Sequence, residues 1–534
     1  MATQFTAKAA PEGDKLRGGY YTPEPIARFI TDWVSAAGSK VLEPACGDGA
    51  ILEHLVRAAS IDQVTAVELI PEEAAKAASI GADVEVSDFF AWLTPQRQAT
   101  FDGVAGNPPY IRFGSWDPSS RELALDLMRT QGMRPTKLTN AWVPFVVGSL
   151  LAVRSGGRVG LVLPAELLQV GYAAALRSYL VDNCSSITVV AFKQLVFPGI
   201  LQEVVLLLAE RGDGPAVIRT VELTDATNLD AFWETDTSAV RAPLHDSEKW
   251  TKYFLDTEAI ELLRSVRRDH RLTPLGTYAD VNVGVVTGRN SFFCMTKSEV
   301  DHRGLADFTM PLVARSTQVG GLHFTNEDLD EQDGTTARTR LLTVSQDVDL
   351  EKHPQLASYL AAGEGAGVPQ GYKCRIRRAW WEVPSLWAPD GFMLRQISTH
   401  PRLIANSAGA TSTDTVHRVR VKDGVDMKRL AVGAFNSATF ALSEVLGRSY
   451  GGGILELEPS ECGLLPVVDP TVVSDTLHQK VDELVRERRF EDALDLVDER
   501  VLVESLGFRP EEVAALRRAW VQLRDRRAAR SKRA

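Results

Sequence analysis

The chain has 534 residues, more than one ordinary hydrophobic core accommodates, so we predict two or three domains. Hydrophobic residues make up 44% of it and charged residues 24%, as is typical of soluble globular proteins. No apolar run approaches the roughly 18 residues that a membrane helix needs, and the polar segment 1–17 contains no apolar export signal. These features exclude a membrane-spanning class, and we expect a cytoplasmic protein.

Cysteine and histidine usage argues against disulfides and metal sites. The five cysteines, at positions 46, 184, 294, 374 and 462, are scattered without paired spacing. This pattern favours a reducing compartment and argues against a zinc site. The nine histidines show no ligand spacing such as HExxH, so we expect no metal.

The first predicted unit of structure is a strand, a loop and a helix over residues 41–52. Gly47 and Gly49 in the loop allow the backbone to approach a ligand closely, as in other nucleotide-binding turns that follow a first strand. The spacing of these glycines differs from G-x-G-x-x-G, so a dinucleotide-binding fingerprint is a poor fit.

The first predicted strand runs into Glu43, and each of the next two predicted strands also has an acidic residue at its end. Residues 64–68 end in Glu68, whose carboxylate can accept hydrogen bonds from both hydroxyls of a ribose. Asp88 and Phe89 follow residues 84–87, and this pair suits hydrogen bonding and packing against an adenine. Each acid alone could be a solvated strand end. Three acids at successive strand ends, counting Glu43, favour a binding site at the carboxyl edge of a parallel sheet.

A fourth predicted strand, residues 101–106, runs into the tetrapeptide Asn107-Pro108-Pro109-Tyr110. The two prolines lack backbone N–H groups, so the turn exposes carbonyls that only accept hydrogen bonds. The Asn107 side-chain oxygen and the Pro108 carbonyl could accept from both hydrogens of an exocyclic amine while Tyr110 stacks on the ring. The alternative is a turn that merely ends a strand.

Together these segments resemble the gamma-class (TaqI-type) N6-adenine DNA methyltransferases, which use S-adenosylmethionine. Gly18 to Pro23 resembles the family's first cofactor segment, and Glu43 to Gly47 its methionine-binding loop. The cofactor-binding residues that the resemblance implies are Tyr21, Thr22, Glu43, Pro44, Ala45, Cys46, Gly47, Glu68, Asp88, Phe89 and Asn107. The catalytic motif that it implies consists of Asn107, Pro108, Pro109 and Tyr110.

The resemblance is strong over about residues 16–210 and looser to about 465. Residues 137–140 lead into a helix, a strand at 159–163 follows, and a further helix contains Tyr172. In the family an aromatic residue of that helix packs on the second face of the flipped base, which makes Tyr172 a further catalytic candidate.

The predicted fold is α/β, with the class I methyltransferase arrangement of a doubly wound, mostly parallel sheet. We expect residues 1–245 to form the catalytic domain and residues 246–470 a mixed α+β domain that recognises the DNA target. Residues 471–534 are predicted as a C-terminal helical, basic segment.

The net charge of −11 is unusual for a DNA-binding protein, but phosphate contacts need only a local basic surface. Residues 373–402 combine six cations with three tryptophans, and residues 517–533 are strongly basic. The first stretch could equally be a strand pair with buried aromatics, and the second a frayed, solvated helix. The candidates for DNA contact, chosen by chemistry alone, are Arg289, Asn290, Arg375 and Arg377.

The implied reaction is methyl transfer to N6 of an adenine flipped out of double-stranded DNA, with no metal. We expect a monomer that serves in a restriction-modification or related defence system, where a separate cognate endonuclease is a possible partner. Fewer than 20 residues precede the cofactor segment, so we do not expect a fused N-terminal nuclease. The alternatives are a methyltransferase of the same fold that acts on RNA or a protein glutamine, and an inactive DNA-binding specificity subunit.

Overall fold

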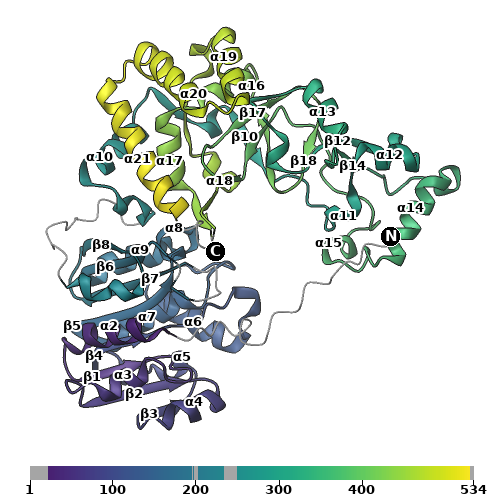
Figure 1. The fold of residues 1–534 in the computed structure, drawn as a ribbon. Helices are drawn as coiled ribbons and strands as arrows, with labels where there is room; N and C mark the ends of the chain where they lie inside the picture. The colour runs from purple at the N-terminus through teal and green to yellow at the C-terminus, as the bar shows by residue number, and fades with distance from the viewer. Residues whose placement is uncertain (1–21, 195, 198–202, 234–248, 451, 530–534) are drawn as a thin grey trace. The chain divides into compact units, whose positions relative to one another are not determined.

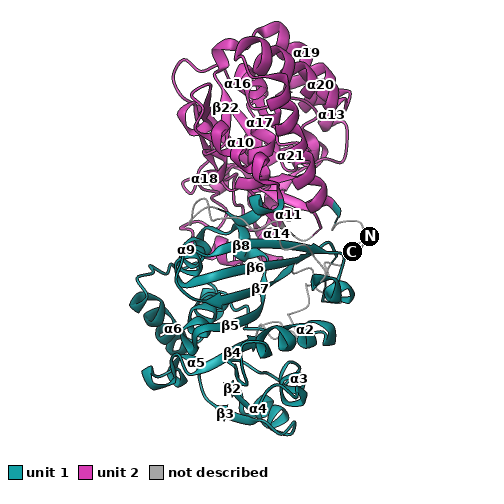
Figure 2. Cartoon of the chain, turned by 90° about the vertical axis from the view of Figure 1, so that its left-hand side faces the viewer, with its two compact units in different colours: residues 1–254, 529–534 teal, residues 255–528 magenta. Residues whose placement is uncertain are grey.

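The computed structural model describes residues 22–194, 196–197, 203–233, 249–450 and 452–529. Tyr21 and the predicted domain boundary at 245 lie outside these residues. The chain divides into two compact units, one running to Phe254 and one spanning Leu255–Ala528 (Figure 2). The first, unit 1, contains the predicted catalytic motifs, and the second is unit 2.

Unit 1 is built on an eight-stranded sheet in the order β3-β2-β1-β4-β5-β7-β6-β8 (Figure 1). Its strands are β1 (Lys40–Glu43), β2 (Gln63–Glu68), β3 (Asp83–Val86), β4 (Phe101–Gly106), β5 (Val153–Pro164), β6 (Cys184–Phe192), β7 (Val204–Arg211) and β8 (Val217–Leu223). Only β7 runs antiparallel to its neighbours in this sheet, β5 and β6. The predicted α/β fold with a mostly parallel sheet is confirmed.

The order of these strands places a switch in direction at the centre of the sheet. The chain proceeds outward from β1 through β2 to β3, then returns to place β4 on the other side of β1. Connections on the two sides of such a point diverge and leave a crevice at the carboxyl ends of the strands. Glu43 ends β1 and Asn107 follows β4, so both residues border this crevice.

Helices connect the strands of unit 1. They are α2 (Glu24–Ser35), α3 (Leu52–Arg57), α4 (Pro71–Ala78), α5 (Phe89–Trp92), α6 (Pro118–Thr130), α7 (Trp142–Ala152), α8 (Glu166–Gln169) and α9 (Ala174–Asn183). Helix α2 fully buries Ile26, Ile30 and Val34, which recur every four residues and therefore share one face. This face packs against β4 and β5, next to the crevice.

Unit 2 has a mixed α+β architecture. Its main sheets are β10-β19-β15-β17-β13 and β11-β14-β12-β18, with smaller sheets β16-β21-β20 and β22-β9. The strands are β9 (Leu272–Pro274), β10 (Ala279–Asn282), β11 (Cys294–Met295), β12 (Thr309–Val313), β13 (His323–Phe324), β14 (Arg340–Leu342), β15 (Gly391–Leu394), β16 (Gln396–Ile397), β17 (Leu403–Asn406), β18 (Thr411–Ser412), β19 (Val416–Val421), β20 (Arg448–Tyr450), β21 (Ile454–Glu456) and β22 (Pro466–Val468).

The helices of unit 2 surround these sheets. They are α10 (Thr257–Arg267), α11 (Asn290–Phe293), α12 (Lys297–Arg303), α13 (Asn326–Asp333), α14 (Pro354–Gly365), α15 (Tyr372–Arg375), α16 (Met427–Gly433), α17 (Ser437–Leu446), α18 (Pro459–Cys462), α19 (Asp475–Arg486), α20 (Phe490–Val497) and α21 (Pro510–Ala528). Within the described ranges, none of the chain's helices has the length and apolar character required to cross a lipid bilayer.

The helices after residue 470 pack into unit 2, although the sequence predicts them as a separate segment. Helix α21 contacts α17 and α10, and α19 contacts α16. Trp520 of α21 is completely buried. The apolar face of α21 thus completes the core of unit 2. This long-range packing could not be inferred from the basic composition of residues 517–533.

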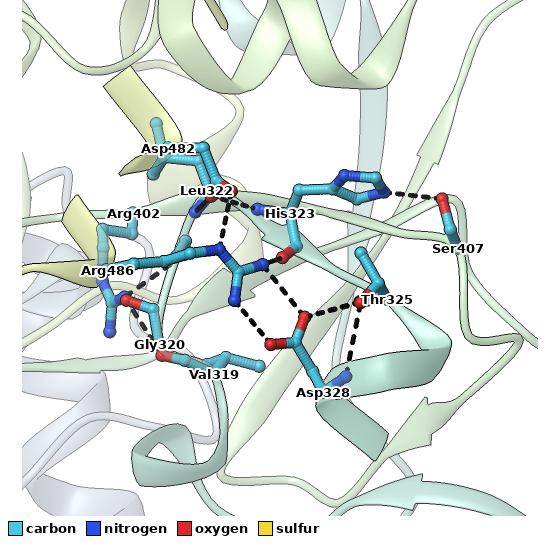
Figure 3. A network of polar contacts seen from close by, with 11 residues as sticks. Val319, Gly320, Leu322, His323, Thr325, Asp328, Arg402, Ser407, Asp482 and Arg486 are labelled. Carbon is cyan, nitrogen blue, oxygen red and sulfur yellow. Dashed lines mark hydrogen bonds and ion pairs between the residues drawn. The ribbon is translucent and has the colours of Figure 1, made fainter. Parts of the chain in front are cut away.

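Polar contacts fix α19 to the segment 319–328, as Figure 3 shows. The Asp482 carboxylate accepts hydrogen bonds from the backbone N–H groups of Leu322 (2.6 Å) and His323 (3.1 Å). Arg486 forms ion pairs with Asp482 (2.7 Å) and Asp328 (2.5 Å) and donates to the His323 carbonyl. These bonds satisfy backbone groups at β13, so they orient α19 on the five-stranded sheet.

A buried ion pair fastens α21. Arg527 donates from two nitrogens to the Glu444 carboxylate of α17, at 2.7 and 3.0 Å, and both side chains are 3% exposed. The guanidinium also donates to the carbonyls of Ser398 (3.0 Å) and Gly453. This arginine of the predicted basic tail is therefore a core residue.

Replacing Arg527 with alanine leaves the Glu444 carboxylate buried without a counter-charge, so we expect the free energy of unfolding to fall by about 3–5 kcal/mol. The control is Arg500→Ala, which removes an exposed pair with Glu504 and should cost no more than about 1 kcal/mol. Urea unfolding followed by tryptophan fluorescence measures both changes. Equal losses in the two variants would contradict a structural role for the buried pair.

Candidate active site

A cavity of about 260 Å³ lies at the carboxyl ends of β1, β2, β3 and β4. Four of the predicted cofactor residues end or follow these strands: Glu43, Glu68, Asp88 and Asn107. The predicted residues that line the cavity are Thr22, Glu43, Pro44, Ala45, Cys46, Gly47, Glu68, Asp88, Phe89, Asn107 and Pro109. The structure therefore brings together segments that are up to 87 residues apart, since Thr22 and Pro109 both face the same space.

The Glu68 carboxylate organises the loop between β1 and α3. One oxygen accepts a hydrogen bond from the backbone N–H of Gly47 and the other from that of Ile70, both at 2.8 Å. A carboxylate has about four lone-pair sites, so each oxygen keeps acceptor capacity toward the cavity. Gly49 in the same loop has φ of +96°, and a Cβ there would lie 2.3 Å from Ile80 Cδ1. Glycine is therefore required at this turn.

Glu43 is buried at the end of β1 and is 2% exposed. Its Oε2 has no hydrogen-bond partner among the described residues. Burial, followed by the charges of Glu68 and Asp48, raises the pKa of its carboxyl well above the usual range. A carboxyl in this state favours the neutral form until a cation approaches it.

Among the residues that the structure describes, the charged side chains that line the cavity are all acidic. The lining acids are Glu43, Asp48, Glu68, Glu73, Asp88 and Asp117. Such a site favours a cationic ligand, because a positive charge relieves the repulsion among the carboxylates. Burial and the Glu43 charge raise the pKa of Cys46, which keeps its side chain a neutral thiol. In the described part of the chain, no group of three or more His, Cys, Asp or Glu could hold a metal ion.

The aromatic wall of the cavity differs in detail from the sequence interpretation. Phe89, the predicted adenine contact, is 3% exposed and stacks on Phe145 at 5.3 Å between ring centroids. A Cβ on Gly148 would lie 2.6 Å from its ring, so α7 and Phe89 are closely packed. Phe90 is only half-buried and also lines the cavity.

Sequence analysis missed Phe90, Ile111, Trp116 and Phe145 as lining residues. The sequence contains the Phe89-Phe90 pair, but the position at which α5 begins decides which of the two rings faces the core, and the sequence does not specify that position. Asp88 caps this helix, and its Oδ1 accepts from the N–H of Phe90 at 2.8 Å. Asp88 therefore positions the aromatic wall as well as lining the cavity.

The catalytic motif follows β4. The Asn107 side-chain nitrogen donates to Thr22 Oγ1 at 3.2 Å, which turns its Oδ1 away from that hydroxyl. The Tyr110 hydroxyl lies 3.1 Å from both Asn107 Oδ1 and the Val162 carbonyl oxygen. Pro108 is buried and Pro109 lines the cavity. The sequence predicts stacking for Tyr110, whereas the hydroxyl contact with Asn107 comes from the structure.

Tyr172 lies in a short 3₁₀ segment, Gly171–Ala173, between α8 and α9 and not within a regular α-helix. Its hydroxyl donates to the Glu166 carboxylate, and its ring centroid is 6.1 Å from that of Trp142. Trp142 begins α7 and is fully buried. Tyr172 is half-buried and thus held between two helices of unit 1.

The four DNA-contact candidates come together in unit 2. Arg377, two residues after α15, donates to the carbonyls of Val286 (3.0 Å) and Thr287 (2.9 Å), which fastens the end of this helical turn to the segment 283–290. Arg289 in that segment donates to the Ala366 carbonyl at 2.8 Å, and Asn290 Oδ1 accepts from Thr287. Arg375 is exposed, and no ion pair is recorded for it within the described residues. Arg377 is thus mainly a support for the others.

The basic stretch 373–402 divides into surface and structural cations. Arg395 forms ion pairs with Glu456 and Glu458, both at 3.0 Å. Arg402 donates to the carbonyls of Val319 and Gly320, as Figure 3 shows. Trp380 and Trp381 pack against a hydrophobic core. These two tryptophans are half-buried in a segment without regular strands, so they support the core without forming the alternative strand pair, and the DNA contact of the exposed cations stays a prediction.

Comparison with known families assigns the two halves of the chain. Residues 3–249 match the N-6 DNA Methylase family. Residues 247–502 match the C-terminal domain of the Type II methyltransferase M.Eco57I.

Relatives of similar length are Type II methyltransferases. M.XamI of Xanthomonas campestris pv. amaranthicola is 24% identical over 83% of this chain and 84% of its own length. M.AccI of Acinetobacter calcoaceticus is 21% identical over 91% of this chain and 92% of its own length. The Type IIL restriction-modification enzyme MmeI, solved in complex with DNA, shares the fold with a TM-score of 0.58 and 11% identity, over 94% of this chain and 75% of that chain. Residues 3–249 thus match the N-6 DNA Methylase family, and the relatives that align with most of the chain are Type II methyltransferases.

Proposed function

We propose that the chain is a gamma-class, TaqI-type enzyme that methylates N6 of an adenine flipped out of double-stranded DNA, with S-adenosylmethionine as the methyl donor. One observation carries the proposal. An amide oxygen, Asn107 Oδ1, lies at the switch point of the sheet beside a cavity whose described charged lining residues are all acids. An acceptor for an amine thus stands next to a site for a cation.

The cavity residues fit the proposed cofactor. S-adenosylmethionine carries a sulfonium and an ammonium group, and it supplies an electrophilic methyl group when bound. Glu43 has an unsatisfied oxygen for a donor such as the ammonium, and Glu68 keeps acceptor capacity for ribose hydroxyls. Phe90, Ile111 and Phe145 offer an apolar surface for an adenine ring. The acidic lining would hold a cationic donor more strongly than the uncharged thioether that remains after transfer.

The catalytic motif would act on the target amine by accepting its hydrogen bonds. Asn107 Oδ1 and the Pro108 carbonyl bias the amine nitrogen toward a pyramidal geometry, which localises its lone pair for attack on the methyl group. The amide is preoriented by Thr22 and by the Tyr110 hydroxyl, so little reorganisation is needed when the base arrives. Most of the rate enhancement would come from this positioning.

Flipping the adenine costs a few kcal/mol, and aromatic stacking at about 1–3 kcal/mol per base offsets part of that cost. Tyr110 and Tyr172 are the residues that we assign to the two faces of the base. The support for Tyr172 is its half-buried position, fixed by Glu166 and Trp142. Each ring would thus be held before the base enters.

DNA recognition would fall to unit 2, on the surface formed by the segment 283–290 and α15. Arg289, Asn290 and Arg375 are the proposed contacts, with Arg377 as their support. The exposed side chains of Tyr372 (64%) and Ile376 (60%) lie in the same turn, because the Ile376 N–H donates to the Tyr372 carbonyl. The match to the N-6 DNA Methylase family and the likeness in fold to MmeI, a restriction-modification enzyme solved in complex with DNA, support a DNA partner and a restriction-modification role. A separate endonuclease, a monomeric state and a cytoplasmic location remain predictions.

Labelled methyl transfer from S-adenosylmethionine to unmethylated plasmid DNA, followed by nucleoside analysis and site mapping, tests the function. We expect N6-methyladenine at one recurrent sequence. Incorporation into RNA or protein with none into DNA would overturn the proposed substrate, although the cofactor assignment would stand.

Asn107→Ala removes the acceptor for the target amine, and we expect kcat to fall by a factor of about 10²–10³ or more. The affinity for S-adenosylmethionine should fall much less than kcat, because Asn107 is one of many predicted cofactor residues and Glu43 and Glu68 are untouched. Asn107→Asp keeps an acceptor oxygen and should retain more activity than the alanine variant. Full activity of Asn107→Ala would refute the proposed role of the amide.

Tyr110 should contribute through both its ring and its hydroxyl. Tyr110→Phe removes the hydrogen bond to Asn107 Oδ1, worth about 0.5–1.5 kcal/mol, so we expect single-turnover methylation to slow by about 3–10-fold. Tyr110→Ala also removes stacking and should lose roughly a further 1–3 kcal/mol. Identical rates for the two variants would argue against stacking by the ring.

Cofactor binding should depend on pH through Glu43. Below its raised pKa the carboxyl is neutral, and above it the carboxyl is anionic, which is the form that a cationic ligand prefers. Affinity should therefore rise as the pH increases through the raised pKa of Glu43, with release of a proton on binding. Titration calorimetry in buffers of different ionisation enthalpy measures this release.

Glu43→Gln should abolish this proton release and weaken binding, whereas the exposed Glu72→Gln, on α4 outside the cavity, should leave both unchanged. Proton release that survives in Glu43→Gln would assign the pH dependence to another group.

A further inference from the structure

Between α6 and α7 of unit 1, residues 134–140 form a turn that presents an apolar side chain to solvent. Leu138 at its tip is 74% exposed, the highest value among the large hydrophobic side chains of the described residues. Single exposed leucines are common on protein surfaces and need no explanation by themselves. The construction, position and charge of this turn distinguish it from such cases.

The turn is rigidly built. The Thr136 N–H donates to Thr139 Oγ1 at 2.9 Å, and the Leu138 N–H donates to Thr136 Oγ1 at 3.2 Å. A backbone hydrogen bond from Thr139 to the Thr136 carbonyl, at 3.0 Å, closes the turn. Thr139 is 1% exposed and Asn140 9% exposed, so the residues after the tip are anchored in the core. Leu138 is thus held outward by a preorganised turn.

The turn lies beside the catalytic motif. The N–H of Ala141 donates to the carbonyl of Ile111, the residue after Tyr110, at 3.0 Å. Trp142, the next residue, contacts the ring of Tyr172. Three peptide units separate Leu138 from Ala141, so their Cα atoms are at most about 11 Å apart. The tip therefore stands next to the place proposed for the flipped adenine.

The cations around the tip are available to an external anion. Arg134 and Lys137 flank the tip, Arg112 follows Ile111, and all three are exposed. The ion pairs found within the described residues include none of them. By contrast, Arg129 in the preceding helix pairs with Glu122 and Asp126. Unpaired cations around an apolar tip match the phosphates and bases of a nucleic acid.

We propose that this turn enters DNA at the target site: Leu138 occupies the gap left by the flipped adenine, and Arg112, Arg134 and Lys137 contact the flanking phosphates. This inference rests on the proposed function and extends it to a residue that stabilises the flipped state. Extrusion of a base removes its stacking partners, and an inserted apolar side chain restores part of the lost contact. A rigid tip performs this with little loss of conformational entropy.

The test compares two duplexes that carry the mapped methylation site. In one the target adenine pairs with thymine, and in the other it faces an abasic site, where flipping is less costly. We expect Leu138→Ala to slow single-turnover methylation of the paired duplex by about 10-fold or more, and of the abasic duplex by less than about threefold. With 2-aminopurine at the target position, its fluorescence reports flipping directly. Leu138→Ala should reduce this signal in the paired duplex and leave it nearly unchanged in the abasic duplex.

The matched control is Leu123→Ala, which shortens another exposed leucine of unit 1, on α6, and should behave as the unmodified chain. Leu138→Met keeps an apolar side chain of similar length and should retain most activity. Equal rates for Leu138→Ala and Leu123→Ala on the paired duplex would overturn the inference, as would an equal loss on both duplexes. Failure of the unmodified chain to methylate DNA would instead overturn the proposed function itself.

The phosphate contacts have a separate signature. We expect the double variant Arg134→Gln/Lys137→Gln to change how DNA binding depends on salt. The slope of the logarithm of the DNA association constant against the logarithm of the salt concentration should become smaller in magnitude by about two, since each lost phosphate contact removes roughly 0.9. Arg57→Gln, which removes a cation already paired with Glu53, serves as the control and should leave the slope unchanged. An unchanged slope in the double variant would overturn the assignment of these two cations.

Discussion

The active-site region depends on the contact between the Glu68 carboxylate and two backbone N–H groups. Gly47 donates from the loop after β1 and Ile70 from the segment after β2, so one side chain joins the ends of adjacent strands. Charge-assisted hydrogen bonds of this kind are among the stronger ones in proteins. They hold the glycine loop in the shape that encloses the cavity. Because Glu68 is 8% exposed, the same carboxylate that orders the loop also faces the ligand space.

Concentrated negative charge is the second property of the site, and it links structure to chemistry. Burial, followed by the charge of the neighbouring Glu68, raises the pKa of Glu43, so the ionised form of its carboxyl is unfavourable in the absence of a counter-charge. A cationic ligand would supply that counter-charge on binding. Asn107 lies at the neighbouring strand end, so in the proposed reaction the methyl donor and the target amine would contact adjacent parts of one sheet edge.

Basic residues in this acidic chain divide into those that hold the fold together and those exposed on its surface. Arg527 pairs with Glu444 in the core, and Arg377 binds backbone carbonyls. Arg375, together with the cations around Leu138, is exposed. Since only unpaired, accessible cations displace counterions from DNA, the net charge of −11 says little about where DNA binds. The positions of the exposed cations are a better guide to a DNA-binding surface.

The sequence alone determined the α/β fold of unit 1 and the strand-end positions of Glu43, Glu68, Asp88 and Asn107. It could do so because strand, loop and turn signals are local, and parallel strands bring their carboxyl ends to one edge. Tertiary structure decided what depends on distant neighbours. It made Phe90 rather than Phe89 the more exposed ring, joined the Tyr110 hydroxyl to Asn107, and buried the predicted basic tail at Arg527. Burial and charge pairing arise from residues far apart in the chain, so local sequence patterns do not specify them.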